Sequence, residues 1–360
     1  MSKRPDVVAF YLPQYHPIPE NDAWWGKGFT EWTNVAKAKP LYKGHYQPDL
    51  PSDLGFYDLR VAETRKDQAD LAKKFGVNVF CYYHYWFGNG RRLLHRPFDE
   101  VLKTGEPDIN FMLCWANQSW TGVWHGLERD MLVEQKYPGI EDEERHFEYL
   151  FSAFSDPRYY KVDGKPVFMF YEALGMPDSK AYIERMRSMA RSYGLSGLYL
   201  IAQKSEVDWD YSNFGYDAFV HLPYFHLHRP KISWTHPVRK IFNKWELILG
   251  IPRRYDYIEM SNYLIPAFAP DGAIPVVMPN WDNTPRSGSR GAVFENASPE
   301  NFALALDRAI RRVKARNHSD NMLFIKSWNE WAEGNYLEPS RKHGDGYLRV
   351  LADSLTKNFE

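Results

Sequence analysis

The feature that most constrains how this chain can fold is a series of eight short apolar runs separated by longer, more polar segments. Each run is mostly apolar along its whole length and does not alternate with polar residues, which is typical of parallel strands buried on both faces. The predicted strands are residues 7–12, 77–83, 109–116, 166–171, 198–203, 216–222, 274–280 and 322–328.

Helical patterns occupy most of the intervals between these strands. In residues 58–75, Leu59 and Ala62 fall on one side with charged residues opposite, and Gly76 follows where a C-terminal cap belongs. The other predicted helices are 142–154, 179–193, 299–315 and 346–357. Strands alternating with helices predict a (β/α)8 TIM barrel, formed by residues 1–360 as a single domain. A doubly wound open sheet is the alternative.

Three long segments follow the first, third and sixth predicted strands, at residues 13–51, 117–138 and 223–270. In a (β/α)8 barrel, segments that follow strands emerge at the C-terminal face, where active sites are built. We therefore expect long loops at that face and a functional site among them.

Charge and cysteine usage restrict the partners and the compartment. The 45 basic and 46 acidic side chains give a net charge of −1, so no overall field attracts nucleic acid or an anionic membrane. The first residues lead into a short apolar run broken by Pro13 and Pro17, without the apolar region of a signal peptide, so we expect a cytoplasmic protein. Cys81 and Cys114 lie within apolar runs, which predicts buried, reduced thiols.

Aromatic residues are abundant and gather beside His, Asn and Asp. The chain has 13 Trp, 24 Tyr and 22 Phe. A pyranose ring offers an apolar C–H face that stacks on aromatic rings and hydroxyl groups that need polar partners. This clustering favours a sugar-binding cleft, and a large aromatic core is the alternative.

The strongest chemical signal is the pair Glu330 and Glu333, which directly follows the last apolar run and is flanked by Trp328, Asn329 and Trp331. At the end of a barrel strand, both carboxylates would project into the cavity. Cleaving an acetal requires one protonated carboxyl group to serve the leaving oxygen and a second, ionised one. Adjacent indoles and the like charge of the partner would raise one pKa. Pairing with Arg or capping of the next helix is the alternative interpretation.

Four separated motifs also carry a family resemblance. They are AFYLPQYHPIPENDAWWGKGFTEWTNV after the start of the first strand, FCYYHYWFGNGRRLL, FMLCWANQSWT and WNEWAEGNYLEP. Together they make the chain similar to WbsX-type, glycoside hydrolase family 99-like proteins over nearly its whole length. The resemblance implies a TIM barrel that acts on an α-linked glycan of mannan or O-antigen type, without a cofactor.

In family 99 proper, the resemblance implies a retaining endo-α-mannosidase that uses two glutamates three residues apart. One takes the proton of the sugar 2-hydroxyl, whose oxygen attacks C1 to form an epoxide, and the other protonates the leaving group. Carried onto this sequence, Glu330 is the base and Glu333 the general acid/base. WbsX-like members occur with polysaccharide and O-antigen biosynthesis functions and have been labelled glycosyltransferases.

Further candidate substrate-binding residues follow the other strands or lie in the long loops. They are Tyr15, His16, Trp25, Glu31, Trp32, His84, Tyr85, Trp86, Trp115, Asn117, Trp120, Tyr171, Glu172, His221, Trp281 and Asp282, together with Trp328, Asn329 and Trp331. We expect His84, Tyr85 and Trp86 to reach the barrel mouth, and a core histidine is the alternative for His84. Glu172 is the rival acid to the glutamate pair. After the seventh strand, a polar cluster is expected to contact substrate, and a turn is the alternative; it consists of Asn280, Trp281, Asp282, Asn283 and Arg286.

Two patterns invite a metal interpretation, but we predict no metal and no cofactor. His221, His226 and His228 match no metal-site spacing. Asp208-Trp-Asp210 fits the DxD pattern of nucleotide-sugar transferases, yet no glycine-rich phosphate loop accompanies it. Residues 231–254 interleave basic and apolar side chains, and we expect them to pack on the barrel rather than to lie on a membrane surface.

The leading hypothesis is therefore a glycosidase-type enzyme whose partner is an oligo- or polysaccharide. A glycosyltransferase or transglycosylase in surface polysaccharide biosynthesis is the alternative, and a catalytically silent glycan-binding barrel is a third possibility. The sequence gives no information on the oligomeric state.

Overall fold

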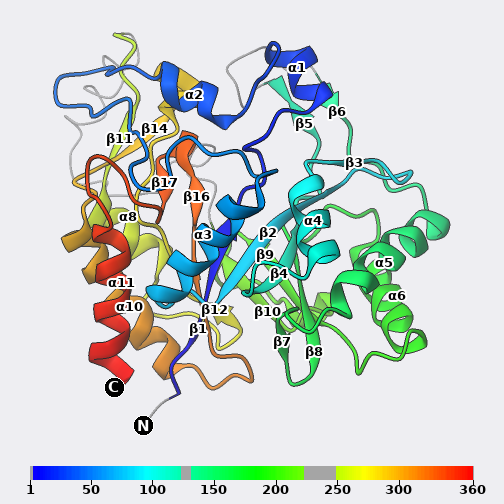
Figure 1. The fold of residues 1–360 in the computed structure, drawn as a ribbon. Helices are drawn as coiled ribbons and strands as arrows, with labels where there is room; N and C mark the ends of the chain where they lie inside the picture. Colours follow the sequence, from blue (N-terminus) through cyan, green and yellow to red (C-terminus); the bar gives the residue numbers. More distant parts are fainter. Residues whose placement is uncertain (1–2, 123–130, 223–248, 360) are drawn as a thin grey trace.

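The eight apolar runs form the eight strand positions of one barrel in the computed structural model, which describes residues 3–122, 131–222 and 249–359 (Figure 1). Each strand pairs in parallel with the next one in the sequence. The barrel strands are β1 (Asp6–Tyr11), β2 (Val79–Trp86), β4 (Asn110–Trp115), β8 (Lys165–Phe170), β9 (Tyr199–Lys204), β10 (Ala218–His221), β12 (Ala273–Ile274) with β13 (Val276–Val277), and β15 (Met322–Ile325).

The barrel closes through the seventh position. β12 pairs with β10, and β13 pairs with β15, while only Pro275 separates β12 from β13. The Pro275 carbonyl still accepts a hydrogen bond of 3.0 Å from the Phe324 N–H. Because β15 also pairs with β1, the strands form a closed ring. The predicted (β/α)8 barrel is thus confirmed, and the open-sheet alternative is wrong.

Helices connect the strands on the outside of the ring. They are α3 (Ala62–Lys74), α4 (Arg96–Thr104), α5 (Ile140–Phe154), α6 (Ser179–Ser192), η2 (Ser212–Phe214), α8 (Tyr257–Leu264), α10 (Pro299–Ala315) and α11 (Gly346–Phe359). The α10 helix shows why these sequences dock: Phe302, Leu306 and Ile310 recur every four residues on its buried face. The Ser298 hydroxyl accepts a hydrogen bond from the Asn301 N–H and caps its start, as predicted.

The C-terminal ends of the barrel strands lie at the top of Figure 1, beneath a cover of short elements. These are α1 (Pro19–Trp25), α2 (Glu31–Lys37), the hairpin β5 (Trp120–Thr121) with β6 (Met131–Val133), β11 (Arg253–Asp256) paired with β14 (Ala292–Glu295), α9 (Thr284–Ser287), η3 (Gly288–Arg290), and the hairpin β16 (Asn329–Glu330) with β17 (Asn335–Tyr336). Two further short strands pair antiparallel with barrel strands: β3 (Arg92–Leu93) with β2, and β7 (Lys161–Val162) with β8.

Other sequence predictions can be compared with this fold. Cys81 and Cys114 are buried free thiols, as expected. No helix among the described residues has the length and apolar character needed to cross a bilayer. Most of the 231–254 segment, together with His226 and His228, lies outside the described residues. Within the described ranges, no three His, Cys, Asp or Glu side chains are grouped in a way that could hold a metal ion.

Candidate active site

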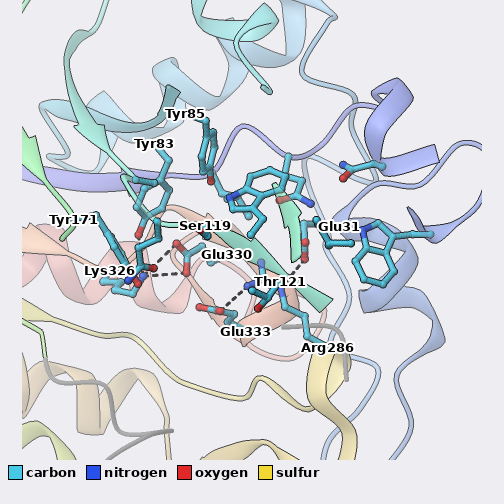
Figure 2. A pocket seen from close by; sticks show the side chains of 18 residues that line it. Glu31, Tyr83, Tyr85, Ser119, Thr121, Tyr171, Arg286, Lys326, Glu330 and Glu333 are labelled. Carbon is cyan, nitrogen blue, oxygen red and sulfur yellow. Dashed lines mark hydrogen bonds and ion pairs between the residues drawn. The ribbon is translucent and has the colours of Figure 1, made fainter. Parts of the chain in front are cut away.

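A cavity of about 160 Å³ opens at the C-terminal face of the barrel, and both Glu330 and Glu333 line it (Figure 2). Glu330 ends β16, and Glu333 ends the single 3-10 turn η4 (Trp331–Glu333) that links β16 to β17. Only 4% of Glu330 and 8% of Glu333 is exposed to solvent. The compact hairpin therefore places two carboxyl groups from the same turn in one enclosed space.

Asn329 fastens this hairpin to the end of β1. Its amide oxygen accepts a hydrogen bond of 2.7 Å from the Leu12 N–H, and its amide nitrogen donates one of 3.1 Å to the Leu12 carbonyl. The Tyr15 hydroxyl donates to the Asn329 carbonyl and accepts from the Trp331 N–H. Asn329 and Tyr15 thus use their polar groups to hold the backbone on either side of Glu330.

Gly334 allows the hairpin to approach its neighbour closely. Its φ is +61°, and a Cβ atom there would lie 2.8 Å from the Asp282 backbone nitrogen. The Asp282 N–H donates a hydrogen bond of 2.6 Å to the Glu333 carbonyl at the same contact. A side chain at position 334 would therefore push apart the two segments that position Glu333.

Replacing Gly334 with Ala is expected to lower the free energy of unfolding by about 2–4 kcal/mol, because backbone strain adds to a steric clash. Gly344 is a matched control, since its φ is +55° and nothing lies within 4 Å of an added Cβ. Gly344→Ala should cost only the strain of about 1–2 kcal/mol. Urea denaturation of both variants measures the difference, and equal losses would show that the clash at Gly334 is absent.

Lys326 lies beside Glu330 at the base of the cavity. Its ammonium nitrogen is 3.1 and 3.2 Å from the two carboxylate oxygens of Glu330, and it donates a 3.0 Å hydrogen bond to the Tyr83 hydroxyl. Burial nevertheless raises the pKa of Glu330 to about 7; Lys326 opposes this rise, and the neighbouring Glu333 carboxylate adds to it. Glu330 can therefore gain or lose a proton near neutral pH.

Arg286 lies on the opposite side of the pair, and Figure 2 shows the two glutamates between Lys326 and Arg286. The Arg286 Nη1 atom is 2.5 Å from Glu333 Oε1, and its Nε atom is 3.1 Å from Glu31 Oε2. Side-chain exposure is 13% for Arg286, 10% for Glu333 and 1% for Glu31. The guanidinium group therefore bridges two buried carboxylates that come from α2 and η4, which are far apart in the sequence.

Asp282 holds the short helix α9 that carries Arg286. Its Oδ1 atom accepts hydrogen bonds from the N–H and the hydroxyl of Thr284, and its Oδ2 atom accepts from Gln47 and contacts His45 Nε2 at 2.7 Å. Because both oxygens are occupied by protein groups, Asp282 is not positioned to bind substrate in this cavity. Asp282 therefore positions α9, and its role in substrate binding stays a prediction.

The cavity brings together several of the predicted substrate-binding residues. Besides Glu330 and Glu333, the predicted residues that line it are Trp25, Glu31, Tyr85, Trp120 and Tyr171. They come from the segments after β1 and β4 and from the ends of β2 and β8. Their functional roles remain predictions, but their common position fits an aromatic cleft around two acids.

Three predicted residues point away from the cavity. His84 and Trp86 contact His146 of α5, with ring centroids 5.1 and 4.6 Å apart, and Trp115 lies 4.7 Å from the same ring. The expectation that His84 and Trp86 reach the barrel mouth is wrong. Successive side chains of a strand point to opposite faces, so Tyr83 and Tyr85 face the cavity while His84 and Trp86 face the helix layer.

Trp32, Trp328 and Trp331 lie behind the cavity rather than in its wall. Trp331 stacks on Tyr336 at a centroid distance of 3.7 Å, and the Trp331 N–H donates to the buried Glu338 carboxylate at 2.6 Å. Trp32 packs on Trp331, and Trp328 packs on Phe80 outside the ring. These indoles support the hairpin, so their assignment to substrate contact is corrected.

The remaining predicted residues also lie outside the cavity wall. The Asn117 side chain bonds both backbone groups of Glu172, and the Glu172 carboxylate accepts from Gln118. His16 is buried, and this burial lowers its pKa to about 4. His221 contacts the Tyr263 ring. Trp281 is buried beside β14 through its backbone bond with Phe294.

Lys326 and Tyr83 were not among the predicted site residues, although both line the cavity. Both left a signal in the sequence. Lys326 interrupts the apolar run 322–328, and a charged side chain in a buried strand indicates a buried partner. Tyr83 lies two residues before Tyr85 and so shares its face. Arg286, which the sequence places in the polar cluster after the seventh strand, lies in α9 and also lines the cavity.

Comparison with known proteins defines the class of this molecule. Its fold matches a solved structure described as a glycoside hydrolase-like protein, with a TM-score of 0.61 and 18% identity over 98% of this chain and 94% of the other. It also matches a GH99 endo-alpha-mannosidase from Bacteriodes thetaiotaomicron, with a TM-score of 0.53 and 16% identity over 98% and 96% of the two chains. These likenesses establish the (β/α)8-barrel fold, which this chain shares with both proteins.

The sequence identifies the family. A family model described as "Glycosyltransferase WbsX" matches residues 7–351, so the chain belongs to the WbsX family. It is 35% identical over 358 residues to the uncharacterized protein WxcX of Xanthomonas campestris pv. campestris (strain B100). The chain spans about half the length of the curated relatives it matches, since 98% of it aligns with 50% of that protein. Fold and family together support a carbohydrate-active enzyme.

Proposed function

We propose that this chain breaks, or exchanges, a glycosidic bond of an α-linked oligo- or polysaccharide by participation of the sugar 2-hydroxyl. The observation that carries the proposal is the pair Glu330 and Glu333, buried together in one cavity that Trp25, Trp120 and Tyr85 also line. Acids and aromatic rings in one cleft fit a reaction that needs proton transfer at a stacked sugar ring.

In the proposed first step, the Glu330 carboxylate takes the proton of the 2-hydroxyl. The 2-oxygen attacks C1, the bond from C1 to the leaving oxygen breaks, and Glu333 gives its proton to that oxygen. In the second step, Glu333 takes a proton from an incoming hydroxyl group, whose oxygen attacks C1. The bond between C1 and the 2-oxygen then breaks, and Glu330 returns its proton to the 2-oxygen.

The incoming hydroxyl group decides the net reaction. Water gives hydrolysis, whereas a sugar hydroxyl gives transfer, so one site could serve a glycosidase or a transglycosylase. Incubation with a panel of α-linked oligosaccharides and bacterial O-polysaccharides would distinguish the two. New reducing ends indicate hydrolysis, longer chains indicate transfer, and the absence of both across the panel would reject the proposal.

The pH dependence tests which glutamate is the base. If Glu330 is the base, it must be ionised, and its pKa is raised to about 7, mainly by burial. We therefore expect kcat/KM to rise with pH up to about 7 before any decline. A pH–rate profile from pH 5 to 9 measures this. A rate that is level below pH 7 and falls above it would assign the proton donor to Glu330 instead.

A transferase that uses a nucleotide sugar is the second candidate, favoured by the description of the family as a glycosyltransferase. It predicts nucleotide binding that depends on a divalent cation, with Asp208 and Asp210 as the sequence candidates. Both side chains are exposed, and Asp210 accepts a hydrogen bond from Ser212. A thermal-shift screen of nucleotide sugars with and without manganese tests it, because ligand binding to the native state raises Tm.

A further inference from the structure

A second cavity lies beside the β16–β17 hairpin, on the side of the hairpin that faces away from the candidate active site. Its volume is about 310 Å³, which lies at the lower end of the range typical of small-molecule sites. The segment 42–49, Asn280 after β13, the segment 293–297 and Lys342 form its wall. Gly334, the residue after Glu333, also lines it, so a single hairpin turn separates the two cavities.

Two oxygen atoms in this second cavity have no hydrogen-bond partner among the described residues. They are Oδ1 of Asp49 and Oδ1 of Asn280, each buried at the atom level. Asp49 as a whole is 6% exposed, and its other oxygen accepts from the Tyr336 hydroxyl. More than nine in ten buried polar groups in proteins are paired, so two unpaired acceptors around one cavity indicate a ligand or water that supplies donors.

Several other polar groups of the wall are already used by the protein. Asp282 is saturated by Thr284, His45 and Gln47, and the Leu41 N–H donates to the second ring nitrogen of His45. Arg254 pairs with Glu295 at 3.0 Å. The chemistry left to a ligand is therefore that of the two acceptors, the ammonium groups of Lys43 and Lys342, and the aromatic rings of the wall.

Aromatic side chains complete the site. Tyr42 stacks on His45 with a centroid distance of 4.6 Å and parallel rings, which fixes the orientation of its ring. Tyr46 is 43% exposed, and the Lys342 ammonium lies 5.0 Å from its ring centroid. A neutral sugar unit suits this wall, because its hydroxyl groups donate to the acceptors and its C–H face packs on a ring. The wall carries charges of both signs, with Lys43 and Lys342 against Asp49, Asp282 and Glu295, so it favours a neutral ligand over an anion or a cation.

We propose that this second cavity is a saccharide-binding site, distinct from the catalytic cavity, that holds another unit of the glycan. The segments that form it follow the first, seventh and eighth strand positions, so both cavities lie at the C-terminal face of the barrel. A glycan bound there contacts the backbone that carries Glu333. The site favours chain-like glycans over short ones, which deepens the proposed function.

The test combines binding and kinetics. A glycan array of α-linked oligosaccharides and bacterial O-polysaccharides is probed with the Glu333→Gln protein and with the same protein carrying Tyr46→Ala or Asn280→Leu. We expect each added change to weaken binding of the longest glycans about tenfold and to leave the shortest bound ones unchanged. Tyr263→Ala is the matched control, since Tyr263 is 38% exposed and lies elsewhere.

In the otherwise unaltered enzyme, Tyr46→Ala should raise KM for the polymer about tenfold while kcat and the rate with short substrates stay unchanged. If the Tyr46→Ala and Asn280→Leu proteins bind the array as the parent does, and the KM of Tyr46→Ala for the polymer equals that of the parent, the proposal is overturned and water is the occupant of the cavity. A parent protein that captures no glycan would overturn it as well. If the unaltered enzyme turns over no glycan while the array still reports binding, the proposed function is rejected and the proposed second binding site is not.

Discussion

Replacing Glu333 with Gln is expected to reduce kcat by about 10²–10⁴-fold, because Gln occupies the same space but cannot give or take a proton. The side chain lines the cavity and contacts Arg286 at 2.5 Å, so its contribution is local to the reacting groups. Glycan binding should remain, since the amide keeps an oxygen acceptor. Initial rates and a binding measurement on the same glycan separate the two effects.

Glu338→Gln is the matched control for this change. Burial raises the pKa of Glu338 to about 7, as it does for Glu330, but Glu338 lies behind the cavity and accepts from Tyr57, Gln68 and Trp331. The amide would face donors on all sides, so this variant should lower Tm and leave kcat within a few-fold of the parent. A fully active Glu333→Gln enzyme would remove Glu333 from the mechanism.

Replacing Arg286 with Met should have the largest effect on stability. It would leave Glu31 and Glu333 buried without their shared cation, and loss of one partner from a buried ion pair costs roughly 3–5 kcal/mol. Activity should fall as well, because Glu333 would lose the group that orients it. Urea denaturation measures the change in the free energy of unfolding.

Two further variants check the cause of the Arg286 effect. Glu31→Gln added to Arg286→Met should recover part of the lost stability, because one unpaired charge is removed. Arg349→Met breaks an exposed pair with Asp345 and should leave Tm unchanged. If Arg286→Met is as stable as the parent, the three side chains do not form the ion-pair bridge described above.

The strands could be predicted from the sequence because residues buried on both faces leave continuous apolar runs. The predicted run 322–328 contains β15, and the predicted helix 299–315 matches α10 residue for residue. The helices α4 and α8 were missed. They have only nine and eight residues, too few turns for the helical period to stand out.

The position of the glutamate pair at the barrel mouth could be predicted because the pair directly follows a strand, and the end of a barrel strand lies at that face. Side-chain direction was harder to predict. His84 and Tyr85 are adjacent, and only the register of β2 in the closed ring decides which of them faces the cavity. The pairing of Arg286 with Glu31 and Glu333 could not be predicted, because the position of Arg286 depends on hydrogen bonds between Asp282 and residues that are distant in the sequence, such as His45 and Gln47.

The anchoring of Asn329 to Leu12 spans 317 positions in the chain. During synthesis, the β1 segment leaves the ribosome before the other strands of this barrel and has one edge without its native neighbour until β15 has been made. The two carboxyl groups can thus be set in place only after synthesis has passed β15 and the β16–β17 hairpin. A nascent chain that stops before this point lacks the assembled glutamate pair, however much of its barrel has already formed.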